Sequence, residues 1–113
     1  MQVHIHAREP QATPLRELAR RRVRFVMRRL AWLVPQATVQ LSDVNGPRGG
    51  VDKRCRVALE PIGMERVVIT SVASDWRQAL DHALSRAARA LLRQWRRSQA
   101  IPRNPQRALP IER

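Results

Sequence analysis

Residues 75–97 read DWRQALDHALSRAARALLRQWRR and contain the strongest structural signal in this 113-residue chain. Asp75 is suited to cap the start of a helix, and Gln78 follows three residues later as its capping-box partner. Apolar residues then recur at three- and four-residue steps: Trp76, Ala79, Leu80, Ala83, Leu84, Ala87, Leu91 and Trp95. This spacing predicts a helix over 75–97 that buries one face in a core.

Three β-strands are predicted directly before this helix. Residues 37–44 and 54–59 alternate apolar and polar side chains, and residues 66–72 are rich in Val and Ile. A loop containing Gly and Pro at 45–50 separates the first two strands, and a turn at 61–63 precedes the third. Short connections between consecutive strands predict an antiparallel meander.

The N-terminal part of the chain predicts one further strand and one further helix. Residues 2–7 alternate apolar and polar side chains, as a half-buried strand does. Pro14 suits the first helical position, apolar residues recur at helical steps to Leu33, and Pro35 follows, so we expect a helix over 14–33. The order β-α-β-β-β-α predicts an α+β fold, a four-stranded sheet with two helices packed on one face.

The remaining features concern domain organisation and compartment. Residues 100–113 contain three prolines, scattered arginines and no apolar period, so we expect a flexible basic tail after an α+β domain at 1–99. Cys55 is the only cysteine, residues 1–10 contain no apolar segment typical of a secretory signal, and the longest apolar run, 30–34, is far shorter than a membrane span. We expect a soluble cytoplasmic protein that is monomeric when free.

The charge of the chain indicates a polyanionic partner. Lys and Arg number 22 against 9 Asp and Glu, which gives a net charge of +13, and every basic residue except Lys53 is an arginine. The first predicted helix contains seven arginines against Glu17, and the second contains six against Asp81. Adjacent surfaces of one sign repel each other unless an anion binds them. We therefore expect a binding surface for nucleic acid, an anionic membrane or an acidic protein.

Among nucleic acids, RNA is favoured over DNA. A wide basic face on two helices suits recognition of backbone and shape, and the sequence contains no helix-turn-helix, zinc-finger or basic-zipper spacing. Trp76 and Trp95 fall on the predicted apolar face of the second helix, so we interpret them as core residues. We therefore do not expect a protein that binds single-stranded nucleic acid by stacking its bases on exposed aromatic residues.

Catalytic and metal chemistry are not indicated. His4 and His6 share a strand face, but zinc needs three or four protein ligands and only His82 and Cys55 remain. Cys55 belongs to an apolar series, so we interpret it as a core residue. The loop at 46–50 lacks the Gly-Lys-Ser/Thr ending of a phosphate-binding loop. The nine acidic residues form no recognisable catalytic set, so we expect no enzyme activity, cofactor, metal or small-molecule substrate.

Over about residues 1–97 the chain resembles the bacterial ribosome hibernation-promoting factor and ribosome-associated inhibitor family. The resemblance rests on the opening strand MQVHI at 1–5, the segment DVNGPRGGVDKRCRV at 43–57 and the helix start DWRQALD at 75–81. The last is similar to the family pattern of Asp, two residues and Ala-Ala-Ile-Asp, with Arg77 where the family usually has Tyr. Basic residues of the family further along this helix match Arg86, Arg89, Arg93 and Arg97. We therefore expect a short-form member of the family, without the dimerisation domain of the long form.

The resemblance implies a domain similar to double-stranded-RNA-binding folds that lodges between the head and body of the small ribosomal subunit. Family members cover the messenger and tRNA decoding sites and hold idle ribosomes inactive, so we expect a hibernation factor that inhibits translation by occlusion. The expected residues binding ribosomal RNA are Arg20, Arg24, Arg28, Arg48, Lys53, Arg54, Arg86, Arg89, Arg93 and Arg97. The alternatives are a basic regulator that binds an acidic protein and an amphipathic protein of the membrane surface.

Overall fold

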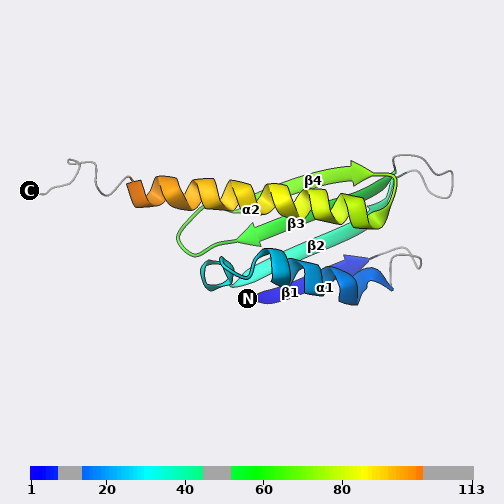
Figure 1. Ribbon diagram of the computed structural model, residues 1–113, viewed down its shortest axis with the longest axis horizontal. Coiled ribbons are helices and arrows are strands. Elements are labelled where there is room, and N and C mark those ends of the chain that lie inside the picture. Colours follow the sequence, from blue (N-terminus) through cyan, green and yellow to red (C-terminus); the bar gives the residue numbers. More distant parts are fainter. Residues whose placement is uncertain (8–13, 45–51, 101–113) are drawn as a thin grey trace, which may run out of the picture.

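Two helices lie on one face of a four-stranded β-sheet (Figure 1). The computed structural model describes residues 1–7, 14–44 and 52–100. The strands are β1 (Gln2–Ala7), β2 (Gln36–Asp43), β3 (Lys53–Glu60) and β4 (Val67–Ala73). The helices are α1 (Leu15–Val26), the short 3-10 helix η2 (Ala31–Leu33) and α2 (Trp76–Ala100). The predicted α+β fold and the predicted positions of its four strands are confirmed to within a few residues.

The strands lie in the order β1-β2-β3-β4, so neighbours along the chain are neighbours in the sheet. β1 pairs parallel with β2 through the α1 crossover, and β2, β3 and β4 form the predicted antiparallel meander. The register aligns Ile5 with Val39, Val39 with Val57, and Val57 with Ile69. A row of branched apolar side chains therefore crosses the whole sheet on the side that faces the helices.

The core lies between the sheet and the helices because each strand alternates its side chains. In β1 the apolar residues are buried, whereas Gln2, His4 and His6 are exposed on the opposite, open face. The core residues contributed by the helices and η2 are Ala19, Val23, Leu33, Ala79, Leu80, Ala83, Leu84, Ala87 and Leu91. The polar residues of both helices thus lie mainly on the side that faces solvent.

The first helix is shorter than predicted. α1 ends at Val26, and the chain continues through a turn into η2, so the expectation of one helix over 14–33 was wrong. Met27, Leu30 and Leu33 recur at steps of three residues, which is the period of a 3-10 helix. Leu30 N donates to Met27 O at 2.8 Å and Leu33 N to Leu30 O at 2.9 Å, as this tighter winding requires.

The second helix begins where the sequence predicts and is slightly longer. Asp75 Oδ1 accepts a hydrogen bond from Gln78 N at 2.8 Å, which confirms the predicted N-cap. α2 continues to Ala100, so this residue is helical although the prediction placed it in the tail. In Figure 1 the C-terminal end of α2 extends past the end of the sheet. The predicted tail beyond Ala100 and the predicted loop at 45–50 lie outside the described residues.

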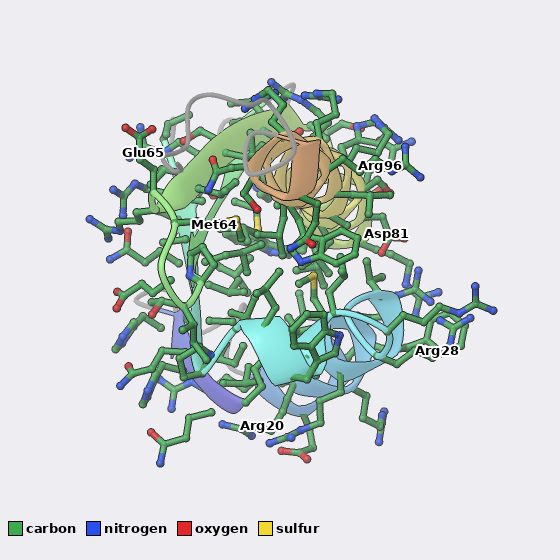
Figure 2. All side chains as sticks on the ribbon, turned by 90° about the vertical axis from the view of Figure 1, so that its left-hand side faces the viewer. Arg20, Arg28, Met64, Glu65, Asp81 and Arg96 are labelled. Carbon is green, nitrogen blue, oxygen red and sulfur yellow. The ribbon has the colours of Figure 1, made fainter. Side chains whose placement is uncertain are left out.

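The turn between β3 and β4 contacts η2 and the C-terminal half of α2 at the end of the molecule that Figure 2 faces, where Met64 and Glu65 are labelled. Gly63, in the predicted turn between β3 and β4, has a positive φ of 70°, which glycine adopts without strain. Ile62 N in this turn donates to Leu33 O at 2.9 Å, and Gln94 Nε2 of α2 donates to Glu65 O at 2.7 Å. These bonds fix η2 and the C-terminal half of α2 against the same turn.

Candidate nucleic-acid interface

Arginine side chains cover the solvent-facing side of both helices. The exposed ones are Arg16, Arg21, Arg24, Arg28 and Arg29 on α1 and the turn after it, and Arg77, Arg86, Arg89, Arg93, Arg96 and Arg97 on α2. Figure 2 shows Arg28 and Arg96, one from each of these groups, pointing to the same side of the molecule and away from the sheet. The structure thus brings the two basic helices together into one surface, which we call the helix face.

Both acidic residues on the helices are paired with arginines. Within α1, Arg20 Nη1 donates to Glu17 Oε1 at 2.8 Å. Between the helices, Arg22 Nε donates to Asp81 Oδ1 at 3.1 Å, and Arg22 Nη2 lies 3.0 Å from the same oxygen. Asp81 appears between α1 and α2 in Figure 2. Because each carboxylate is already neutralised, it does not compete with an incoming anion for the remaining arginines of the helix face.

A groove lies between the two helices on this face. Its floor is apolar, formed by Val26 and Leu30 on one side and Ala88 and Leu92 on the other. Its rim is cationic, formed by Arg28, Arg29 and Arg89. The groove has a volume of about 510 Å³, which falls within the range of about 300–1,000 Å³ found for ligand pockets. Sequence reasoning missed this groove because it depends on the spacing of two helices.

Aromatic side chains lie close to the ends of both helices. Trp32 of η2 and Trp95 of α2 pack edge to face, with ring centres 6.1 Å apart and planes at 85°. Trp95 and Trp76 are half-buried against the core, in agreement with the sequence interpretation. Trp32 is instead 64% exposed. Phe25 is also exposed, and the Arg28 guanidinium carbon lies 4.2 Å from its ring centre.

The sequence-predicted arginines of the helices occupy three kinds of position. Arg24, Arg28, Arg89, Arg93 and Arg97 are exposed on the helix face. Arg86 is exposed at its margin, because Nη1 donates to Thr70 O of the edge strand β4 at 3.2 Å. Figure 2 shows Arg20 on the side of α1 away from α2, where it pairs with Glu17. Two exposed arginines that the sequence prediction omitted also lie on the helix face: Arg29, which lines the groove, and Arg96, which Figure 2 labels.

Lys53 occupies a polar cluster at the end of the sheet where α2 begins. Its Nζ lies 3.0 Å from Asp43 Oδ2 and 3.2 Å from Asp52 Oδ1, and the side chains of these aspartates are only 2% and 0% exposed. The ammonium group also lies 5.6 Å from the centre of the Trp76 ring. The hydrogen bond to Asp43, supported by Asp52, raises the pKa of Lys53 against the opposing effect of burial. The charge of Lys53 is thus already neutralised by two carboxylates.

The other two predicted RNA-binding residues are not on the helix face. Arg54 precedes the buried Cys55 in β3, so it projects to the open face of the sheet. There its Nε donates to Ser42 Oγ at 3.3 Å, and it lines a small depression of about 190 Å³ with His6, Gln40 and Ser42. Arg48 lies outside the described residues. The structure therefore separates Lys53 and Arg54 from the arginines of the helices.

The structure also describes Cys55 and the side chains that could bind a metal ion. Cys55 is fully buried, as predicted for a core residue, and desolvation raises the pKa of its thiol to about 12. Across residues 1–7, 14–44 and 52–100, no three His, Cys, Asp or Glu side chains are grouped so that they could hold a metal ion. No helix in these same segments is long and apolar enough to cross a bilayer.

Comparison with known proteins identifies the fold. The chain matches no protein-family model and none of the curated proteins. Among solved structures, it is similar to a ribosomal subunit interface protein from Coxiella burnetii, with a TM-score of 0.65 and 12% sequence identity. The two chains share a fold. The alignment covers 82% of this chain and 96% of the other, so the likeness extends over almost the whole of the second protein.

Proposed function

We propose that this protein is a ribosome-associated factor that binds RNA of the small ribosomal subunit through its helix face. The observation that carries the proposal is that arginines from two helices form one surface on which both helical carboxylates are neutralised. The fold shared with a ribosomal subunit interface protein supports the ribosome as the site of binding. The sequence resemblance to hibernation factors points in the same direction.

The mechanism requires only binding. Guanidinium groups bind phosphate oxygens through paired hydrogen bonds. Two helices side by side present these groups over a width suited to folded RNA. Binding releases counterions from the RNA, so affinity falls steeply as salt rises. With its helix face bound to RNA of the small subunit, the protein would cover the messenger and tRNA decoding sites. It would thereby keep an idle ribosome inactive, as a hibernation factor does.

Charge reversal on opposite faces of the sheet tests which surface binds. The double variant Arg89→Glu, Arg93→Glu alters the helix face, and Arg54→Glu, Arg56→Glu makes the same change in net charge on the open face. We expect wild type and the open-face variant to co-sediment with small subunits at low salt and to dissociate at high salt. The helix-face variant should stay at the top of the gradient with an unchanged helical circular dichroism signal.

The outcomes separate the alternatives. Co-sedimentation of the helix-face variant at wild-type level would contradict the proposed surface. Loss of binding in the open-face variant would place RNA contacts on the open face of the sheet, where the sequence predicted Arg54 to bind RNA. Wild-type protein remaining at the top of the gradient at low salt would favour a regulator that binds an acidic protein.

The occlusion step has its own test. Small subunits programmed with a messenger bind tRNA, and this binding should decrease in proportion to the amount of protein bound. Tight binding of the protein to subunits without any decrease in tRNA binding would show that it docks away from the decoding sites.

A further inference from the structure

We infer that the groove between α1 and α2 binds one unpaired nucleotide of the recognised RNA, with its base on the apolar floor and its adjoining phosphates on the rim arginines. This inference rests on the proposed function and goes further, because it specifies the RNA: the element bound contains a base that is free to leave its helix. Phosphate contacts alone would not distinguish such RNA from a continuous duplex.

The length of the floor favours a single base over a longer ligand. Ala88 and Leu92 are one helical turn apart, and Val26 and Leu30 face them with the same sequence spacing. A step of four residues corresponds to about 6 Å along a helix axis. An amphipathic helix from a protein partner would anchor residues spread over two turns, about 10 Å. The apolar floor is therefore too short for a docked helix and long enough for a planar base.

Side-chain contacts limit the groove at both ends. The Arg22–Asp81 ion pair joins the helices before Val26 and Ala88. The Trp32–Trp95 pair joins η2 to α2 just after Leu30 and Leu92, with ring centres 6.1 Å apart. The groove is thus a depression that is open to solvent and limited at each end by an interhelical contact, so it does not form a channel along the molecule.

Trp32 is not part of the groove lining, but it provides an aromatic surface just beyond the end at Leu30 and Leu92. The indole is 64% exposed, yet its orientation is fixed by a hydrogen bond from Nε1 to Arg29 O at 3.0 Å and by the contact with Trp95. An exposed, oriented indole stabilises an unstacked base because every base has a planar π-face. The sequence analysis assigned Trp76 and Trp95 to the core and did not identify Trp32 as an exposed aromatic residue.

The charges of the rim match an anionic ligand. Arg28 is held at the rim by a hydrogen bond from Nη1 to Phe25 O at 2.7 Å and by its contact with the Phe25 ring. Arg29 and Arg89 are exposed on opposite sides of the floor, so a nucleotide between them would place a phosphate near each helix. Residues 101–113 contain three arginines and one glutamate, and a second copy of the chain has the same basic surface. Both would be repelled from the rim.

Two RNA hairpins of equal length test the inference, one fully paired and one with a single bulged nucleotide. We expect wild-type protein to bind the bulged hairpin about tenfold more tightly, the scale of one base stacking on an aromatic side chain. Ala88→Leu fills the groove without changing charge and should bring the two affinities within about twofold, with unchanged affinity for the paired hairpin. His82→Leu adds apolar bulk at an exposed position of α2 outside the groove lining and should keep the tenfold preference.

The outcomes distinguish this inference from the proposed function. Equal wild-type affinity for the two hairpins, or an Ala88→Leu variant that keeps the preference, overturns the nucleotide site while RNA binding stands. Failure of wild type to bind either hairpin at low salt overturns the proposed function itself. Displacement of the bulged hairpin by an acidic helical peptide from wild type, together with no peptide binding to Ala88→Leu, would assign the groove to a protein partner.

Discussion

Arg22 of α1 and Asp81 of α2 are 59 residues apart in the sequence and form the ion pair that joins the two helices, with Arg22 Nη2 3.0 Å from Asp81 Oδ1. Both side chains are more than 30% exposed. The pair fixes one end of the groove and neutralises the only carboxylate of α2. It therefore connects the geometry of the helix face to its electrostatics.

Replacing Asp81 should affect stability and RNA binding in opposite directions. For Asp81→Asn we expect the free energy of unfolding to fall by less than about 1 kcal/mol, because exposed ion pairs contribute little. RNA affinity at low salt should rise several-fold, because the helix face gains one unit of positive charge. Urea unfolding and filter binding measure the two effects. Arg22→Gln removes the same pair and should weaken RNA binding; equal RNA affinities for the two variants would contradict this account.

The N-cap of α2 should contribute to stability only. Asp75→Ala removes the acceptor of the 2.8 Å hydrogen bond from Gln78 N and should lower the free energy of unfolding by about 1 kcal/mol. Ser74→Ala changes the preceding exposed residue and serves as the control. Thermal unfolding followed by circular dichroism should show a lower Tm for the first variant alone. A change in RNA affinity for Asp75→Ala would show that the start of α2 participates in binding.

Lys53 and Arg93 should show opposite effects when their charges are removed. Lys53→Met leaves the buried carboxylates of Asp43 and Asp52 without this cation, so we expect a larger decrease in Tm than Asp75→Ala causes. Its RNA affinity, measured below the lowered Tm, should equal that of wild type. Arg93→Gln should leave Tm unchanged and weaken RNA binding. A stable Lys53→Met protein with reduced RNA affinity would instead make Lys53 a phosphate contact, as the sequence predicted.

The buried thiol should make the protein less stable in alkaline solution. Burial raises the pKa of Cys55 from 9.0 to about 12, so the folded state keeps its proton at a pH where the unfolded chain loses it. The unfolded state then binds fewer protons, and stability falls as pH rises from the unfolded pKa toward the folded one. At pH 10 this effect amounts to about 1.4 kcal/mol.

Urea unfolding at pH 8 and pH 10 measures this effect when wild type is compared with Cys55→Ala. The raised pKa of Lys53 also lowers stability as pH rises, and it does so in both proteins, so it cancels in the comparison. Wild type should lose about 1.4 kcal/mol more than the variant over this interval. Equal losses would show that the Cys55 thiol is not desolvated in the folded state.

Local patterns in the sequence determined the strands, the second helix and the α+β order. Alternation in β1 to β3 and the cap at Asp75 involve residues within a few positions of one another, so the printed sequence contains the whole signal. The sequence did not predict the end of α1 at Val26, because apolar residues continue at steps of three and four residues to Leu33 and both steps are compatible with an α-helix. The uniform three-residue steps from Met27 to Leu33 fit the 3-10 winding that the structure shows.

Only the tertiary structure decided which charges act together. The antiparallel register places Lys53 opposite Asp43. The ion pair between them neutralises a positive charge that the sequence analysis assigned to RNA binding. Strand alternation places Arg54 on the open face, and the packing of α1 beside α2 forms both the Arg22–Asp81 pair and the groove. Electrostatic and packing interactions depend on distance in space, so residues 59 positions apart can neutralise each other while neighbours in the chain lie on opposite faces.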